Sequence, residues 1–482
     1  MPQRSLASRA ILALALAIGF YVLAIGIALG LLGAVYAELV YANEILVKPT
    51  IFAVIGAILI LWSILPRIDR FTAPGPQLHA DAQPELFALI SDVAAKTGQP
   101  MPREVYLIPE VNAWVMQRGG LAGIGSRRVM GIGLALLQSV EVEHLRAILA
   151  HEFGHYHGGD TALGPWIYKT RMAIGRTIQN LSRSSLHKPF LWYGNFFLKV
   201  TQAISRAQEL AADKLAATIA GGRTTIDALT AVHRAGAAYD AYWSSEVLPV
   251  LSNGFLPPIA AGLTQFMSCA EVEKQLGAFM QREMTEGTAD KYDSHPPLRE
   301  RVAALEALGA GGLTSGGPRA VTLLRDLDGL EAEMVRPMFV NPDQAAKLRA
   351  LRWEEAPAQV YAPLWRKRVE EHAGVLRELN MVGVSDIARA LPQFALRLGL
   401  RHVPPQEAEA DTQAILGCAM ATRLIDDGWV CDAAPGAPVT LTKDGCTVSP
   451  FLVVPRLIKG ELTAEAWAAE CAAAGIDTRP LA

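Results

Sequence analysis

Cysteine is scarce in this sequence and is not spaced for a metal site. Only five cysteines occur in 482 residues, and no two of them form a CxxC pair: Cys269, Cys418, Cys431, Cys446 and Cys471. The odd number and the irregular spacing give no support to a disulfide framework or to a cysteine-based zinc site. The pattern fits a protein of a reducing compartment.

The sequence also lacks an excess of charge of either sign. Its 44 basic and 47 acidic side chains leave a formal net charge of −3. A protein that binds nucleic acid usually carries a basic patch or a strongly basic domain. No nucleic-acid partner is therefore expected.

Two N-terminal stretches contain no charged residue at all. The first, Ala10 to Ala37, is long enough as a helix to cross a bilayer, and the second, Pro49 to Pro66, is shorter and rich in Ile, Leu and Val. A cleaved signal peptide is the alternative for the first stretch. That stretch is too long for a signal core, lacks an obvious cleavage site and is followed by a second apolar run. We therefore predict a transmembrane hairpin over residues 1–70, with spans at about 10–36 and 49–66.

The charges that flank the two spans predict their orientation. Basic residues lie before the first span and after the second, whereas the connecting loop carries two acidic residues and one lysine: Arg4, Arg9, Arg67 and Arg70 outside the loop, and Glu38, Glu44 and Lys48 within it. By the positive-inside rule, the N-terminus and everything after residue 66 face the cytoplasm. A bacterial inner-membrane protein is the expectation.

The chain after the hairpin alternates helical and strand-like patterns. "PELFALISDVAAKTG" has helical spacing, with Pro84 at its start and Gly98 at its end. "REVYLI", "AWVMQ" and "RRVMGIG" are short β-rich stretches that predict a small antiparallel sheet. A helix is expected next, from about Ser139 to Tyr156. The glycine-rich stretch from Gly309 to Pro318 predicts a linker.

Three of the ten histidines lie in the short segment "AILAHEFGHYHGGD". His151 and His155 are four residues apart, so on a helix they share one face and can bind one ion. Glu152 follows the first histidine and can take a proton from the attacking water. This is the HExxH arrangement of zinc hydrolases. The alternative interpretation is that His151 and His155 are two ordinary histidines on a helix surface.

A catalytic zinc usually has three protein ligands. "SRAQELAADKLAA" offers Glu209 and Asp213, again four apart on a predicted helix. We assign Glu209 as the third ligand and Asp213 as a hydrogen-bond acceptor that orients a ligand histidine. From the residues alone, a solvated helix face explains this pair about as well.

"HEFGH", "SRAQELAAD" and "SHPPLRER" together resemble the family of zinc metallopeptidases that contains the HtpX heat-shock proteases and the CAAX prenyl proteases. The resemblance covers roughly residues 84 to 305 and the general character of the hairpin. It implies that His151, His155 and Glu209 bind one Zn²⁺ per chain and that Glu152 is the catalytic base. It also implies that Asn112 and Ala113 of "VNAWV" hold the substrate backbone, and that His295 of "SHPP" lies near the zinc and contacts the oxyanion.

The sequence departs from the better-known members of this family between His155 and Glu209. Those members have additional spans, whereas five basic residues interrupt this segment: Lys169, Arg171, Arg176, Arg183 and Lys188. Only two spans are therefore expected. With only two spans, the protein is not expected to form an enclosed intramembrane chamber of the prenyl-protease kind or to act on a prenylated substrate.

We therefore predict a mainly helical α+β protein with three regions. A two-helix transmembrane hairpin (1–70) precedes a zincin-like metallopeptidase domain with a small antiparallel sheet (78–308). A C-terminal mixed α/β region of unknown role follows (319–482), helical over 319–395 and mixed over 405–482. The segments 319–395 and 405–482 are expected to be two separate parts of the C-terminal region.

The function predicted is that of a membrane-anchored zinc endopeptidase. Its substrates are expected to be peptides or proteins, such as misfolded membrane proteins, and its role membrane-protein quality control. One alternative is a non-catalytic membrane scaffold that is braced by zinc and binds a partner through its C-terminal region. Glu152 argues against the scaffold, because a structural zinc site needs no base beside the metal. A zinc hydrolase that acts on bonds other than peptide bonds is the third possibility.

Overall fold

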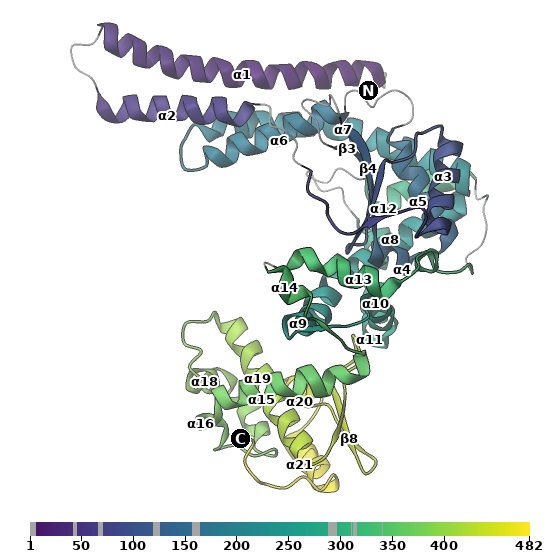
Figure 1. Ribbon diagram of the computed structural model, residues 1–482. Coiled ribbons are helices and arrows are strands. Elements are labelled where there is room, and N and C mark those ends of the chain that lie inside the picture. The colour runs from purple at the N-terminus through teal and green to yellow at the C-terminus, as the bar shows by residue number, and fades with distance from the viewer. Residues whose placement is uncertain are drawn as a thin grey trace. The chain divides into compact units, whose positions relative to one another are not determined.

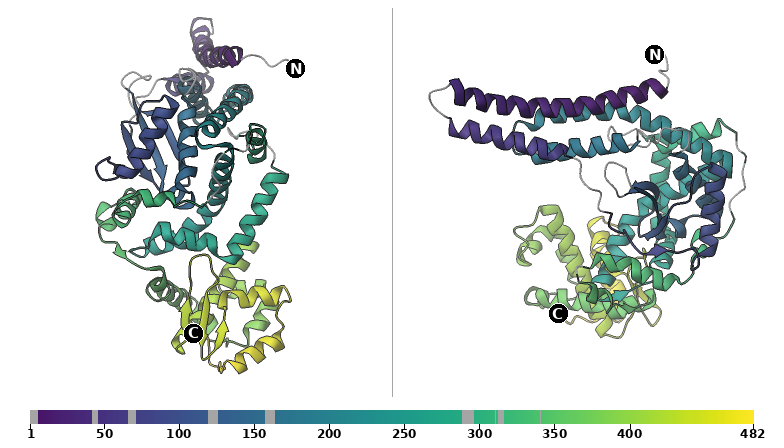
Figure 2. Two further views of the ribbon diagram at one scale, coloured as in Figure 1. Left: turned by 90° about the vertical axis from the view of Figure 1, so that its right-hand side faces the viewer. Right: turned by 45° about the horizontal axis from the view of Figure 1, so that its top comes forward.

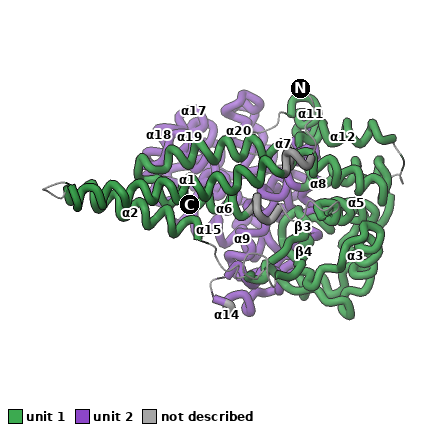
Figure 3. Tube along the Cα trace, turned by 90° about the horizontal axis from the view of Figure 1, so that it is seen from above, with its two compact units in different colours: residues 1–235, 279–330 green, residues 236–278, 331–482 purple. Residues whose placement is uncertain are grey.

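The structure is a computed structural model that describes most of the chain. The described residues are 6–41, 46–65, 71–118, 126–156, 164–287, 296–309, 311, 316–339 and 341–482. They divide into two compact units, residues 1–235 with 279–330 and residues 236–278 with 331–482 (Figure 3). The chain passes between the units within three helices, α8 (Gly222–Tyr242), α11 (Ala270–Thr285) and α13 (Leu327–Val335). The domain boundaries given above remain a prediction.

The first unit is mainly helical, with one small sheet (Figure 1). Its remaining elements are α1 (Leu6–Tyr41), α2 (Val47–Ile64), β1 (Gln77–Leu78), α3 (Pro84–Thr97), β2 (Glu104–Ile108), β3 (Ala113–Arg118), β4 (Arg127–Gly133), α4 (Leu134–Ser139), α5 (Val142–Gly154), α6 (Gly164–Asn180), α7 (His187–Ala220), α12 (Leu298–Glu306) and the 3₁₀ turn η3 (Ala320–Leu323).

The two N-terminal helices form the predicted hairpin, and α1 and α2 run side by side in Figures 1 and 2. Ile11–Tyr41 and Val47–Ile64 are long and apolar enough to cross a membrane, and no other helix in the described part of the chain meets that criterion. Large apolar side chains point outward along both helices, among them Val22, Ile55 and Trp62. An aqueous surface rarely carries so much exposed apolar area, whereas lipid accommodates it.

The hairpin packs on two later helices, α6 and the first half of α7. Phe20, Ile60, Ile174 and Phe190, one from each of the four helices, are buried in one apolar cluster. The α7 helix has 34 residues, so it continues well beyond this cluster. The same helix therefore connects the apolar hairpin with the segment that carries Glu209.

The sheet has the strand order β1-β2-β4-β3, so β3 lies at an edge of the sheet among the described strands. The three predicted strand segments are confirmed. The β1–β2 and β3–β4 pairings are antiparallel, and the β2–β4 pairing is parallel. Gly133 N donates to Asn112 O at 2.8 Å, and Trp114 lies opposite Gly131. Because hydrogen-bonded pairs alternate along an antiparallel ladder, Ala113, Val115 and Gln117 turn their backbone groups away from β4.

Local sequence explains where the helices around the sheet begin and end. The predicted helix from Pro84 to Gly98 is confirmed as α3, with Pro84 in its first turn and Gly98 in the left-handed conformation (φ 66°). The helix expected from Ser139 is interrupted, because Val140 is extended and Glu141 caps a new helix at Val142. Glu141 and His144 form a capping box there.

The second unit combines helices with two small sheets. Its elements are the π-helical turn η2 (Trp243–Val247), α9 (Leu248–Ser252), β5 (Phe255–Leu256), α10 (Ile259–Ser268), the 3₁₀ turn η4 (Arg336–Met338), α14 (Pro342–Ala345), β6 (Arg349–Ala350), the 3₁₀ turn η5 (Trp353–Glu355), the π-helical turn η6 (Pro357–Tyr361), α15 (Ala362–Glu371), α16 (Ala373–Leu376), α17 (Val384–Arg389), α18 (Leu391–Arg397), α19 (Pro405–Asp426), β7 (Val430–Asp432), β8 (Thr440–Lys443), β9 (Cys446–Val448), α20 (Pro450–Ile458) and α21 (Ala464–Ala473).

The core of the second unit is built around α19. Ile415, Met420 and Leu424 of this helix are fully buried, together with Trp467 of α21 and Leu441 of β8. The strands β7, β8 and β9 form an antiparallel meander, and β5 pairs with β6 in parallel. All five cysteines are free thiols.

Candidate metal centre

Two helices supply the predicted metal ligands and the predicted base of the candidate centre. His151 and Glu152 lie in the last turn of α5, His155 caps its C-terminus, and Glu209 lies on α7. The apolar side of α5 is buried, with Leu145, Leu149 and Phe153 all fully covered. This packing holds the last turn of α5 against α7.

The three predicted ligands converge. His151 Nε2 lies 3.4 Å from Glu209 Oε2, and His155 Nε2 lies 3.7 Å from Glu209 Oε1. One ligand atom from each of the three residues lies within 4.8 Å of the other two. The two imidazole rings are nearly perpendicular, with centroids 4.7 Å apart. Two imidazoles and a carboxylate fit a metal ion with open coordination positions, and zinc is one of the ions that bind to such a donor set.

Gly154 allows α5 and α7 to approach closely enough for this convergence. A Cβ at this position would lie 3.0 Å from Ala212 Cα and 3.1 Å from Ala212 Cβ. These distances are too short for an unshifted side chain, and Ala212 is fully buried. The glycine of HEFGH therefore lets the two helices pack closely, and a side chain at this position would require Ala212 to shift.

Substituting Gly154 by Ala is expected to push α5 away from α7 and weaken zinc affinity about tenfold, because overpacking costs about 1–3 kcal/mol. The reciprocal change Ala212→Gly removes one of the two clashing atoms. The double variant should therefore recover part of the affinity. Competition with a fluorescent chelator measures the zinc affinity of both single variants and of the double variant. If the double variant binds zinc no more tightly than Gly154→Ala, the contact between residues 154 and 212 is not the cause of the loss.

Asp213 binds His151 and fixes its orientation. Its Oδ1 lies 2.9 Å from His151 Nδ1. A carboxylate only accepts hydrogen bonds, so Nδ1–H donates and Nε2 is left to face Glu209 and a metal ion. This is the arrangement predicted for Asp213.

Arg301 is a buried member of the centre that the sequence did not single out. Its Nε and one terminal nitrogen donate to the two oxygens of Asp213, at 2.8 and 2.6 Å. Arg301 is 5% exposed and Asp213 is 1% exposed. Arg301 comes from α12, so Arg301, Asp213 and His151 form a chain of contacts across three helices. The string "SHPPLRER" contains Arg301, but spacing alone does not select one of its two arginines.

The electrostatics of the centre follow from burial and from these contacts. Burial lowers the pKa of His151, but hydrogen bonds to Asp213 and Glu209 and the charge of Glu152 outweigh it and raise the pKa to about 9. Burial likewise raises the pKa of Asp213, but the hydrogen bonds from Arg301 and His151 bring it below its usual value. A metal ion takes the place of the proton on an imidazole nitrogen, so binding at His151 releases that proton.

Tyr156, next to His155, connects the end of α5 with the edge strand β3. Its hydroxyl donates to Val115 O at 2.7 Å, and the Arg128 guanidinium lies over its ring at 4.5 Å. Val115 is one of the residues whose carbonyl points away from β4. Tyr156 therefore occupies one acceptor on the open edge of β3, which the sequence did not indicate.

The structure places the other predicted site residues as follows. Ala113 begins β3 and is buried, and Asn112 precedes it with an exposed side chain. Glu152 is partly exposed, and its charge acts on both His151 and Arg301. His295 lies outside the described residues.

The candidate centre lies within the part of the chain that resembles known proteins. Residues 80–308 match the sequence model of peptidase family M48. The chain is 24% identical over 285 residues to "Protease HtpX" of Idiomarina loihiensis, covering 54% of this chain and 86% of that protein. It is 24% identical over 247 residues to "Protease HtpX homolog" of Ralstonia pickettii, covering 48% of this chain and 75% of that protein. No solved structure matches the chain. Residues 80–308 therefore resemble peptidase family M48, and together with the two apolar N-terminal helices this similarity supports a membrane metallopeptidase that acts on peptide or protein substrates.

Proposed function

We propose that this protein is a membrane-anchored zinc endopeptidase in which Glu152 is the general base. The observation that carries the proposal is the convergence of His151, His155 and Glu209 beside that glutamate. A structural zinc site closes with a fourth protein ligand, whereas a catalytic site keeps a position open. The described residues supply three candidate ligands, with Glu152 next to His151 in the sequence, which supports the catalytic alternative over the scaffold.

The reaction assigns one task to each of these side chains. His151, His155 and Glu209 would hold the zinc ion. When bound, zinc supplies Lewis-acid activation of water and of the scissile carbonyl. Glu152 takes a proton from the attacking water and later delivers it to the leaving amine. His295 is proposed as a second donor to the developing oxyanion.

Asp213 and Arg301 act on His151 and not on the substrate. Asp213 holds the ring of His151 through Nδ1, and Arg301 neutralises Asp213. This arrangement keeps Nε2 aimed at the metal position and raises the basicity of the ligand. They are positioning residues.

The edge strand β3 is proposed to bind an extended substrate, with Asn112 and Ala113 at its start. Backbone groups of Ala113 and Gln117 point away from β4 and are oriented to pair with a peptide strand. Such pairing gives affinity with little sequence preference. It fits a protease that cleaves misfolded membrane proteins as part of quality control, with its catalytic domain at the cytoplasmic face of a bacterial inner membrane.

Removing the tyrosine hydroxyl in Tyr156→Phe is expected to lower kcat/KM about two- to tenfold, the effect of one neutral hydrogen bond. The bond from Tyr156 to Val115 holds β3 beside the end of α5. Zinc content should not change, because Tyr156 is not a ligand. Steady-state kinetics with metal analysis check this, and unchanged kinetics would show that the bond does not position β3.

Metal removal tests the proposed function directly. Detergent-purified protein should contain one zinc ion per chain and cleave a mixed peptide library, with the products read by mass spectrometry. A chelator should abolish cleavage, and stoichiometric zinc should restore it. Cleavage that survives removal of the metal would contradict the proposal.

A further inference from the structure

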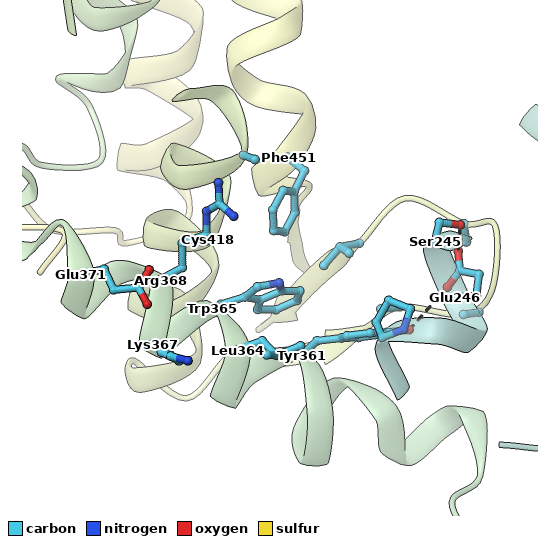
Figure 4. A pocket seen from close by; sticks show the side chains of 16 residues that line it. Ser245, Glu246, Tyr361, Leu364, Trp365, Lys367, Arg368, Glu371, Cys418 and Phe451 are labelled. Atoms are coloured by element: carbon cyan, nitrogen blue, oxygen red, sulfur yellow. Dashed lines mark hydrogen bonds between the residues drawn. The ribbon is translucent and has the colours of Figure 1, made fainter. Parts of the chain in front are cut away.

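The second unit contains a pocket that the proposed peptidase reaction does not use (Figure 4). Its volume is about 560 Å³, and it is formed by η2 with α9, by η6 with α15, by α19, by α20 and by the segment between β7 and β8. Small-ligand sites in proteins usually measure about 300–1,000 Å³. All of its lining residues belong to this one unit.

Three aromatic side chains form one wall of the pocket. The rings of Tyr361 and Trp365 are stacked, with centroids 6.1 Å apart and an angle of 20° between their planes. Phe451 packs on Trp365 with a centroid distance of 5.3 Å. This wall offers aromatic faces to a ligand, and Figure 4 shows Phe451 next to Trp365.

Glu246 lies at the Tyr361 end of this wall, and within the described part of the chain its negative charge is balanced only by weak hydrogen bonds. It accepts from Gly436 N at 3.2 Å, and from the hydroxyls of Ser245 and Tyr361 at 3.4 Å each, which is long for such bonds. Across the described residues no lysine, arginine or histidine forms an ion pair with it. Burial raises the pKa of Glu246, although these hydrogen bonds work in the opposite direction.

The basic side chains of the pocket lie away from Glu246. Figure 4 shows Arg368 and Glu246 on opposite sides of Trp365. Arg368 already pairs with Asp411 at 3.1 Å, and Lys367 is exposed. Among the described charges that line this pocket, Glu246 is therefore the one that is partly buried and has no ion-pair partner, whereas Lys367 and Glu371 are exposed.

The two residues at this end of the pocket both come from π-helical turns. Glu246 lies in η2 and Tyr361 ends η6. A π-helical turn is a costly backbone feature that occurs frequently at functional sites. Both η2 and η6 line the pocket, so the two π-helical turns indicate a functional site there without reference to the charge of Glu246.

We propose that this pocket binds an organic cation, an ammonium or guanidinium group on an apolar stem. The cation would pair with Glu246 and lie over the ring of Tyr361, while the stem packs on Trp365 and Phe451. Aromatic faces attract cations, and a desolvated carboxylate gains a charge-assisted hydrogen bond. The cation could be a free small molecule or the side chain of lysine or arginine in a peptide, which share this chemistry. The inference does not depend on the peptidase activity.

Binding of butylguanidinium to the full-length protein in detergent, measured by ligand-observed NMR and calorimetry, tests the proposal. Butylurea has the same shape without the charge and should bind at least about tenfold more weakly. Glu246→Gln should weaken butylguanidinium binding by a similar factor. Glu371→Gln is the matched control, because Glu371 also lines the pocket but is exposed at the other end; affinity should stay within about twofold.

Glu246→Gln is expected to fold normally. Glutamine keeps the acceptor for Gly436 N and removes a partly buried charge that has no ion-pair partner among the described residues, so the thermal midpoint should be unchanged or higher. Tyr361→Leu is a second variant that removes the aromatic face and leaves Glu246 in place; it should also weaken binding. Equal affinity for butylguanidinium and butylurea, stronger binding of pentanoate, unchanged affinity in Glu246→Gln, or no binding at about 10 mM would each overturn the proposal.

A peptide arm distinguishes the two sources of the cation. Acetyl-Ala-Arg-Ala-amide should displace butylguanidinium if a basic side chain is the natural occupant, and the citrulline peptide should not. Displacement by the arginine peptide assigns the pocket to peptides. Binding of butylguanidinium without displacement assigns it to a small cation, and both results support the shared chemistry.

Discussion

Glu152→Gln is expected to lower kcat for peptide hydrolysis about 10²- to 10⁴-fold while zinc stays bound. The size of the effect is that of removing a positioned general base. The ligands His151, His155 and Glu209 are untouched by the change, and glutamine has nearly the same volume as glutamate. Peptide cleavage and zinc content are measured on the same preparation.

Glu143→Gln is the matched control for this experiment. Glu143 lies on the same helix and its carboxylate pairs with Arg146 at 3.0 Å, on a partly exposed surface. Such a pair contributes about 0–1 kcal/mol, so activity and stability should be close to those of the unmodified protein. A zinc-loaded Glu152→Gln protein with normal activity would show that Glu152 is not the base. If the unmodified protein, Glu152→Gln and Glu143→Gln all bind zinc but cleave no peptide, the result would favour the non-catalytic membrane scaffold.

Arg301→Met is expected to lower the free energy of unfolding by about 3–5 kcal/mol, the effect of removing one partner from a buried ion pair. It leaves the carboxylate of Asp213, which is 1% exposed, without its two charge-assisted hydrogen bonds. Zinc affinity should fall as well, because Asp213 orients His151. Thermal unfolding in detergent and chelator competition measure the two effects.

A second change separates charge from packing in this experiment. Adding Asp213→Asn to Arg301→Met removes the uncompensated charge and should recover part of the lost stability. Arg299→Gln on the same helix is the control, because Arg299 is exposed and, among the described residues, donates to Thr285 O at 3.1 Å. If the double variant is no more stable than Arg301→Met, lost packing and not the buried charge explains the effect.

The parts of this protein that could be predicted from sequence depend on short-range spacing. The absence of charge predicted both hairpin helices, and β-rich stretches predicted the three longer strands of the sheet. A spacing of four residues on a helix was enough to place His151 near His155 and Glu209 near Asp213. Each of these inferences uses only the geometry of one helix or one strand.

Tertiary structure decided which helix faces pack against each other and which side chains balance buried charges such as that of Asp213. The close approach of Gly154 to Ala212 joins the histidine helix to the glutamate helix. Arg301 reaches Asp213 across 88 residues, and Tyr361 reaches Glu246 across 115. No local pattern specifies such partners, because a buried charge can be compensated by any donor that the fold brings within reach. The sequence by itself nominated the candidate metal-binding residues, and only the packing of helices determined which side chains surround them.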